Sequence, residues 1–366
     1  MFKSFLMGGF ECSTHKRRDG IRLDVIAATG HDQHAAADYR QLANHGLRTV
    51  RDGMRWHLIE QRRGQLDFAS LLPMVQAARD TNTQVIWDLF HYGWPNWIDV
   101  WAPGFAERFA AFARAVATVL RDESDDVPWW CPVNEISFFA WIAGDVGGFN
   151  PFAHGRGGEL KVQLVRAAIA ATEALREVDP RARFICAEPL ICVFPKSPKP
   201  GDTAAAAAYT EAQFEAVDML TGRLRPDLGG QPHYLDHYGA NYYVANQWRD
   251  GGSTIPPGHH DYRALQYLLA DIHARYGCPL LVAETGTEGG FRAAWLHYVA
   301  DQVAAAIAAG VPVNGLCLYP ILSHPGWDDE RRCPNGLFDA SHAAADRAAD
   351  PALAAELARQ ISRFAA

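Results

Sequence analysis

The sequence predicts an α/β protein built as a single (β/α)8 TIM barrel, and three observations lead to this fold class. Short apolar segments alternate with longer amphipathic segments eight times along the 366-residue chain. Several short segments are apolar at both alternating positions, as expected for strands of a parallel sheet that is covered on both faces. No linker or change in composition divides the chain, so we expect one domain over residues 1–366. A doubly wound sheet with an added domain is the alternative.

The expected strands are short apolar runs, several of them rich in β-branched and aromatic residues. They are residues 5–11, 48–52, 84–90, 129–135, 183–189, 238–244, 279–286 and 313–320. The expected helices repeat apolar side chains every three or four residues, and several end at a glycine. They are residues 34–46, 68–81, 105–123, 159–179, 209–222, 262–277, 291–310 and 352–365.

Charge and cysteine content exclude several classes of protein. The net charge is −8 and Lys and Arg form no extended block, so we expect no nucleic-acid partner. Seven cysteines without a C-x-x-C pair argue against a disulfide framework or a zinc ribbon and favour the reducing cytoplasm. We expect no membrane association, because no apolar run approaches the ~18 residues of a membrane span. The first residues, MFKSFLMGGFECS, also lack the long apolar core of a signal peptide.

The ends of the predicted strands carry polar and mostly acidic side chains. In a (β/α)8 barrel the carboxyl ends of the strands form the edge that holds the active site. The side chains at this edge are Glu11, Arg51, Asp52, His91, Asn134, Glu135, Glu188, Asn241, Tyr243, Glu284 and Tyr319. The edge lacks a well-placed lysine, which a Schiff-base aldolase requires. The histidines match no standard metal-site spacing, so we expect no metal ion.

Two of these carboxylates, Glu135 and Glu284, end the fourth and seventh strands, which lie on opposite sides of an eight-stranded barrel. Glycoside hydrolysis uses such a facing pair, one as acid and the other as nucleophile or base. Arg51 and Tyr243 would stabilise the anionic form of Glu284. The apolar run WWCPV before Glu135 would raise the pKa of Glu135 by desolvation, which suits a general acid. We therefore expect Glu284 to be the nucleophile and Glu135 the acid/base.

Five segments around these residues resemble the motifs of glycoside hydrolase clan A, and of family 1, the β-glucosidases and their relatives, in particular. The segments are TVRDGMRW, DLFHYGWPNWI, WWCPVNEIS, GANYYV and PLLVAETGTEGG, in matching order. The resemblance implies a retaining, exo-acting β-glycosidase with a carbohydrate substrate and without a cofactor. It implies that Glu135 is the acid/base and Glu284 the nucleophile. It also places Arg51 and Tyr243 beside the nucleophile and His91 at a sugar hydroxyl.

The chain departs from the family pattern among the sugar contacts. His15 stands where the family has a glutamine, and Tyr319 and Gly326 replace a tryptophan and a glutamate of the eighth strand. Trp327 is kept, and the resemblance makes it a platform for the sugar. We expect Asn134 to bind the 2-hydroxyl of the sugar. The other expected substrate contacts are Asn241, His15 and Tyr319.

Other functions stay open at this point. The rebuilt set of sugar contacts is compatible with a catalytically silent sugar-binding barrel. An endo-acting clan A glycanase, or a glycosidase for an unusual sugar, would keep the chemistry and change the substrate. Arg331 and Arg332 could meet an anionic substrate, although a solvated loop is the simpler interpretation.

Overall fold

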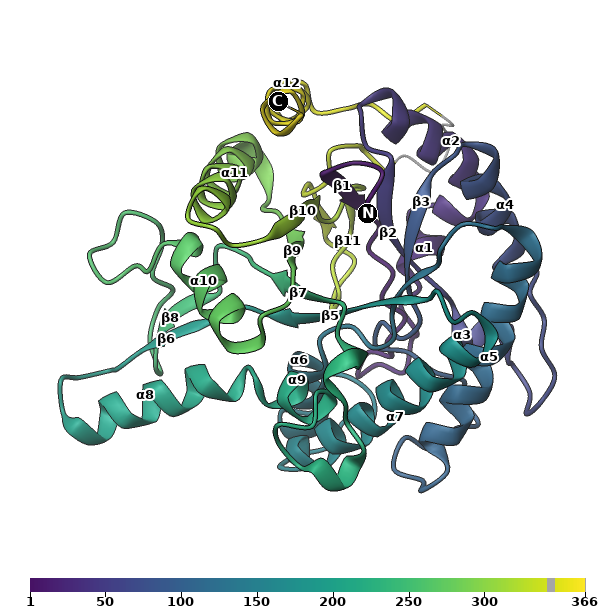
Figure 1. Ribbon diagram of the computed structural model, residues 1–366, viewed down its shortest axis with the longest axis horizontal. Coiled ribbons are helices and arrows are strands. Elements are labelled where there is room, and N and C mark those ends of the chain that lie inside the picture. Colours follow the sequence, from purple (N-terminus) through teal and green to yellow (C-terminus); the bar gives the residue numbers. More distant parts are fainter. Residues whose placement is uncertain (341–345, 366) are drawn as a thin grey trace.

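Eight parallel strands close into a barrel in the computed structural model, which describes residues 1–340 and 346–365 (Figure 1). Each strand pairs with the next around the barrel, and the last pairs with the first. In this order they are β1 (Leu6–Gly9), β2 (Thr49–Gly53), β3 (Gln84–Asp88), β4 (Trp129–Cys131), β5 (Arg183–Pro189), β7 (His237–Asn241), β9 (Leu280–Thr285) and β10 (Val313–Leu318). The (β/α)8 TIM barrel predicted from the sequence is confirmed.

Helices surround the barrel and connect its strands (Figure 1). They are α1 (Val25–Ala28), α2 (His31–Asn44), α3 (Trp56–Ile59), α4 (Leu72–Asp80), α5 (Phe105–Glu123), α6 (Ile136–Phe139), α7 (Gly157–Val178), α8 (Pro200–Ala212), α9 (Glu215–Leu220), α10 (Leu265–Tyr276), α11 (Arg292–Ala308) and α12 (Pro351–Phe364). Within the described residues, no helix combines the length and the apolar character needed to cross a membrane.

The segment after β5 differs from the sequence prediction. A single helix over residues 209–222 was expected, but two helices, α8 and α9, occupy this part of the chain. The alanine-rich α8 extends away from the barrel in Figure 1, together with a small parallel sheet of β6 (Cys192–Phe194) and β8 (Gln247–Arg249). Only Ala206 of α8 is buried, so apolar periodicity could not mark this helix.

A small apolar cluster fills the barrel beneath its carboxyl edge. It consists of Met7, Ile86, Trp129, Cys131, Ile185, Ala187, Leu281, Ala283, Cys317 and Tyr319. A larger apolar layer packs between the strands and the helices.

Closure of the barrel brings β1 against β10, with Gly8 opposite Leu318. A Cβ atom at Gly9 would lie 2.0 Å from Cδ2 of Tyr319, so only glycine fits at this position. Closure therefore sets Tyr319 directly against the end of β1.

Candidate active site

Glu135 lies at the junction between the fourth strand and helix α6. The strand is shorter than the expected 129–135, because β4 ends at Cys131. Glu135 is the residue before α6, has φ 45° and ψ 60°, and its N–H donates to the carbonyl oxygen of Ala187 at 2.9 Å. Left-handed backbone is costly for a glutamate and is found mainly where the surroundings impose it. The backbone therefore fixes the direction of the Glu135 side chain.

Both carboxyl oxygens of Glu135 accept hydrogen bonds from buried side chains. The hydroxyl of Tyr92 donates to Oε2 at 2.8 Å, and Nδ2 of Asn241 donates to Oε1 at 2.9 Å. Asn241, expected among the substrate contacts, thus holds the carboxyl group of Glu135. Tyr92 was not among the predicted site residues. The only sequence signal for it is that an aromatic residue directly follows His91 in the loop after β3.

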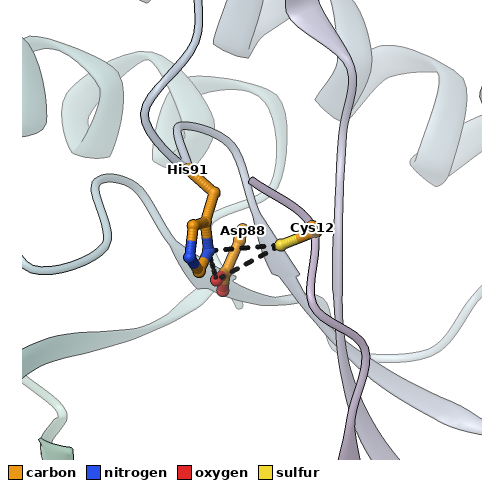
Figure 2. Close-up of side chains that lie close together, drawn as sticks. All are labelled: Cys12, Asp88 and His91. Carbon is orange, nitrogen blue, oxygen red and sulfur yellow. Dashed lines mark hydrogen bonds and ion pairs between the residues drawn. The ribbon is translucent and has the colours of Figure 1, made fainter. Parts of the chain in front are cut away.

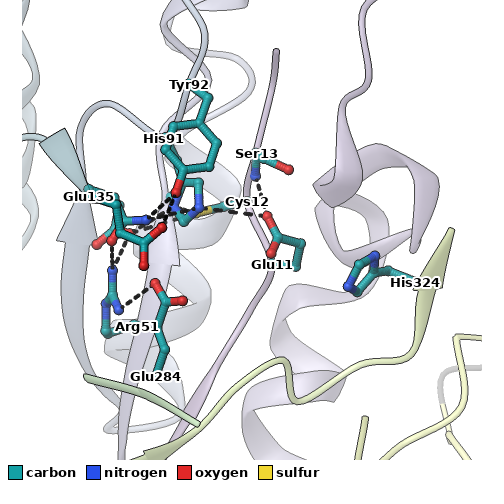
Figure 3. A network of polar contacts seen from close by, with 12 residues as sticks. Glu11, Cys12, Ser13, Arg51, His91, Tyr92, Glu135, Glu284 and His324 are labelled. Carbon is teal, nitrogen blue, oxygen red and sulfur yellow. Dashed lines mark hydrogen bonds and ion pairs between the residues drawn. The ribbon is translucent and has the colours of Figure 1, made fainter. Parts of the chain in front are cut away.

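Glu284 is the fifth residue of β9, and both of its carboxyl oxygens accept hydrogen bonds. Arg51 donates to Oε1 at 3.0 Å, and the hydroxyl of Tyr243 donates to Oε2 at 2.9 Å. Both contacts stabilise the anionic form of the carboxyl group. Figure 3 shows Glu135 and Glu284 turned into the same part of the site, with Arg51 beside Glu284.

Arg51 is fully buried and joins the two halves of the site. It donates to the backbone carbonyl of Ala283 at 3.0 Å, to Oδ2 of Asp88 at 2.6 Å and to Oδ1 of Asn134 at 3.0 Å. The Nδ2 of Asn134 in turn donates to the Tyr92 hydroxyl at 3.1 Å. A continuous chain of hydrogen bonds therefore connects Glu284 to Glu135.

Asp52 does not belong to this site, although it ends the second strand beside Arg51. Successive side chains of a strand point to opposite faces, and Asp52 faces the helices. There Nε2 of His31 lies 2.8 Å and the Tyr39 hydroxyl 2.5 Å from Oδ2 of Asp52. Nδ1 of His31 lies 2.7 Å from Oδ2 of Asp38. These residues form a buried charged network between α2 and β2.

Glu188, another of the carboxylates expected at the edge, lies in the fifth strand and is fully buried. It accepts a hydrogen bond from the backbone N–H of Ser137 at 3.1 Å. Burial raises the pKa of Glu188 to about 7.

His91 lies next to Asp88 and Cys12, as Figure 2 shows. Nδ1 of His91 is 3.1 Å from Oδ2 of Asp88 and 3.2 Å from Sγ of Cys12, and Nε2 is 3.2 Å from Nδ2 of Asn134. The side chains of Cys12, Asp88 and His91 are close enough together to hold a metal ion. A second such group, on the surface, is His259, His260 and Asp261. However, the guanidinium of Arg51 already occupies Oδ2 of Asp88 and would repel a cation there.

Burial and mutual repulsion favour the neutral form of Glu135. Burial, with the nearby charge of Glu284, raises the pKa of Glu135 to about 8. Burial raises the pKa of Glu284 as well, but Arg51 opposes this rise. When two carboxyl groups share one site, the proton resides on the one without the cation. The arrangement therefore holds an anionic Glu284 beside a protonated Glu135 near neutral pH.

The remaining predicted contacts lie around this pair. The buried His15 ring stacks on Phe149 with centroids 3.8 Å apart, and its Nε2 is 3.3 Å from the carbonyl oxygen of Trp327. The rings of Trp327 and Tyr92 meet edge-on at 5.9 Å. Arg51 lies 5.5 Å from the ring centre of Tyr319. The structure thus brings together all ten predicted side chains at one edge of the barrel. The ten are His15, Arg51, His91, Asn134, Glu135, Asn241, Tyr243, Glu284, Tyr319 and Trp327.

The basic side chain of Arg331 has a partner on the surface instead. It makes two hydrogen bonds to the exposed carboxylate of Glu288, at 2.8 and 2.9 Å.

No protein-family model and no curated protein sequence matches the chain. Solved structures do match it. A family 1 β-glucosidase from Thermotoga maritima superimposes with a TM-score of 0.79 at 14% identity, covering 97% of this chain and 96% of that one. The chain folds as the family 1 β-glucosidases do.

Two further solved structures match the chain to a similar degree. The AHE enzyme from Alicyclobacillus herbarius matches with a TM-score of 0.79 at 16% identity. The match covers 99% of this chain and 100% of that one. A variant of rice β-glucosidase Os3BGlu6, solved in a covalent complex with glucose, matches with a TM-score of 0.79 at 15% identity. The match covers 97% of this chain and 98% of the rice chain. At such identities the matches show the fold, and the chemistry has to be argued from this chain's own residues.

Proposed function

We propose that this chain is a retaining, exo-acting β-glycoside hydrolase that works by double displacement. One observation carries the proposal. Glu284 and Glu135 lie in one buried hydrogen-bond chain, and their surroundings favour opposite protonation states. Double displacement requires such a pair, with one carboxylate as nucleophile and one carboxylic acid as proton donor. The likeness to solved family 1 β-glucosidases supports the same reaction class.

In the first step, the Glu284 carboxylate attacks the anomeric carbon and forms a glycosyl ester. Arg51 and Tyr243, which donate to its two oxygens, hold the carboxylate in place for attack. Glu135 gives its proton to the glycosidic oxygen as the bond to the leaving group breaks. The leaving group departs as an alcohol, and Glu135 becomes a carboxylate.

In the second step, a water molecule attacks the same carbon and Glu135 takes its proton. The ester bond to Glu284 breaks, which restores both carboxyl groups and releases the sugar with its original anomeric configuration. In the proposed mechanism Asn134, whose carbonyl oxygen accepts a hydrogen bond from Arg51, binds the 2-hydroxyl of the sugar. Besides the glycoside, the proposed reaction consumes only water, and it needs no cofactor.

We also propose that the enzyme works in the reducing cytoplasm, as one catalytic domain over residues 1–366. All seven cysteines are free, and all except Cys278 are buried. An oxidising compartment would expose these thiols to oxidation whenever the chain is unfolded.

The test combines a substrate panel with the Glu284→Ala variant. Wild-type protein is assayed with nitrophenyl β-glycosides of several sugars, and proton NMR of the best reaction should show the β-anomer forming first. Glu284→Ala should lower turnover by several orders of magnitude. Azide should restore part of the activity and yield an α-glycosyl azide, because azide enters where the carboxylate is missing.

Glu288→Ala is the matched control, because this exposed glutamate lies four residues after Glu284, beyond the end of β9, and pairs with Arg331 on the surface. It should retain wild-type turnover. Wild-type activity in Glu284→Ala would refute the assignment, and an initial α-product would indicate inversion. Tight sugar binding without turnover of any substrate would point to a catalytically silent barrel.

A further inference from the structure

Glu11 is a third buried carboxylate at the edge of the barrel, and the two-step reaction does not use it. It follows β1 and is 6% exposed. Its Oε1 accepts a hydrogen bond from the backbone N–H of Ser13 at 2.9 Å and lies 3.7 Å from Nε2 of His91, beyond hydrogen-bonding distance. Within the described part of the chain, its Oε2 takes part in no hydrogen bond of normal geometry, and the Ser13 hydroxyl lies near enough to help lower the pKa of Glu11.

The charge of Glu11 acts on the catalytic residues. Burial favours its neutral form, but His91, His324 and the hydrogen bond from Ser13 outweigh burial and lower the pKa of Glu11. The carboxyl group is therefore anionic at neutral pH, and its charge contributes to raising the pKa of Glu284. In Figure 3 Glu11 lies across the site from Glu135, with His91 between them. A buried anion without a hydrogen-bonded cation is costly unless a ligand supplies the missing donor.

Two neighbouring groups also lack partners. Tyr319 is 2% exposed, and its buried hydroxyl has no hydrogen-bond partner among the described residues. Glu11 is the nearby charge that most strongly opposes ionisation of this hydroxyl. Nδ1 of the fully buried His15 is likewise without a partner in the described chain. Buried polar groups nearly always have partners in a complete complex. Unpaired groups that gather around Glu11 therefore indicate a place for a polar ligand.

We propose that Glu11 determines substrate specificity by accepting a hydrogen bond from a hydroxyl or ammonium group of the sugar in the reacting subsite, with Tyr319 beside it. This inference rests on the proposed glycosidase function. The donor on the sugar completes the hydrogen bonding of Oε2. The same anion repels a carboxylate or a phosphate on the sugar, so Glu11 selects against acidic sugars.

The experiment uses Glu11→Gln, whose amide oxygen can still accept the hydrogen bond from Ser13. Wild type and variant are compared on nitrophenyl glycosides of the preferred sugar, of its monodeoxy analogues, of the amino sugar and of the corresponding uronic acid. We expect kcat/KM of the variant to fall about 10- to 100-fold for the preferred sugar, as for a lost hydrogen bond to a charged group. One deoxy analogue, which lacks the bound hydroxyl, should be hydrolysed equally by both proteins.

The panel also distinguishes the two donors. If the amino sugar is the preferred substrate and only its kcat/KM falls in the variant, the donor is an ammonium group. If removal of one hydroxyl abolishes the difference between wild type and variant, the donor is that hydroxyl. The uronic acid should gain rate in the variant relative to the other sugars. An unchanged kcat/KM for every sugar, or an equal loss for all deoxy analogues, would overturn the inference.

A binding measurement separates this inference from the proposed reaction. Isothermal titration with the methyl glycosides of the same sugars reports on Glu11 even if the wild type hydrolyses none of them. If the wild type hydrolyses no sugar, a selective loss of affinity in Glu11→Gln would support the role of Glu11 and refute the proposed hydrolase function. A wild type that binds no sugar would refute both proposals. Glu356→Gln is the control, because this buried carboxylate on α12 bonds to Gln360, outside the site. It should leave both hydrolysis and binding unchanged.

Discussion

Tyr92 donates a 2.8 Å hydrogen bond to Glu135, and both residues have left-handed backbone, with φ of 71° and 45°. Such a conformation costs on the order of 1–3 kcal/mol for each non-glycine residue. Packing and hydrogen bonding must hold it in place. The Tyr92 ring stacks on Phe139 with centroids 5.3 Å apart, and the N–H of Glu135 is bonded to Ala187. The backbone on both sides of the hydrogen bond thus fixes the position of the Glu135 carboxyl group.

Removing the Tyr92 hydroxyl should change the pH dependence of the reaction. The hydroxyl stabilises the carboxylate form of Glu135. In Tyr92→Phe the pKa of Glu135 should therefore rise above its value of about 8, and the alkaline limb of kcat/KM should move to higher pH. Tyr298→Phe, which loses a hydroxyl bonded to Tyr262 outside the site, should leave the limb in place. A downward shift in Tyr92→Phe would contradict this account.

Glu135→Gln should remove the alkaline limb altogether. An amide cannot donate the proton, so hydrolysis of glycosides with basic leaving groups should slow about 10²- to 10⁴-fold. Dinitrophenyl glycosides need little acid assistance, so their first step should persist and release a burst of dinitrophenol while the glycosyl ester accumulates. Rapid-mixing absorbance measurements across the pH range check both points. Persistence of the limb in this variant would show that another group is the acid.

Tyr243→Phe should weaken the nucleophile. The hydroxyl donates to Oε2 of Glu284, and loss of a hydrogen bond to a charged group lowers kcat/KM by about 10- to 100-fold. The acidic limb should also move to higher pH, since the anion of Glu284 loses a donor. Tyr234→Phe is a matched control, because that hydroxyl bonds to Glu173 away from the site. Equal behaviour of the two variants would argue against a role for Tyr243.

The buried network around His31 should make stability depend on pH. Burial alone would lower the pKa of His31, but Asp52 and Asp38 raise it to about 9. Because the pKa is higher in the folded state, this stabilisation is fully present below pH ~6.5, the value in the unfolded chain, and is lost as the pH rises through about 9. The shift corresponds to about 3 kcal/mol.

Urea unfolding of wild type and His31→Gln at several pH values tests this prediction. The difference in unfolding free energy should shrink by about 3 kcal/mol between pH 6 and pH 10. A constant difference would contradict it. NMR of the wild-type imidazole gives a second readout, since its proton shifts should stay those of imidazolium well above pH 7.

The sequence predicts the site well wherever strand ends determine it. In a parallel barrel all strands end at the same edge, so Glu135 and Glu284 could be paired without knowledge of the loops. The alternation of side chains along β2 also contains the information that only one of Arg51 and Asp52 faces this edge. Both residues were expected at this edge, but in the structure only Arg51 reaches it.

Other features could not be read from the pattern. Tyr92 reaches Glu135 through a left-handed turn that no glycine or asparagine marks at that position. Asp88 was hidden within the apolar run 84–90, and its role follows only from the 2.6 Å contact with Arg51. Glu11 ends a predicted strand, but its unpaired oxygen becomes visible only when the surrounding donors are placed.

The pairing of β1 with β10 has a consequence for synthesis of the protein. Strand β1 leaves the ribosome before the other seven strands of the barrel, whereas its neighbour β10 is the last of them to emerge. The nascent barrel therefore keeps two open strand edges, which are prone to wrong pairing, until β10 has been made. If translation stops before residue 313, the barrel cannot close. The chain then keeps an open sheet that is exposed to cellular proteases.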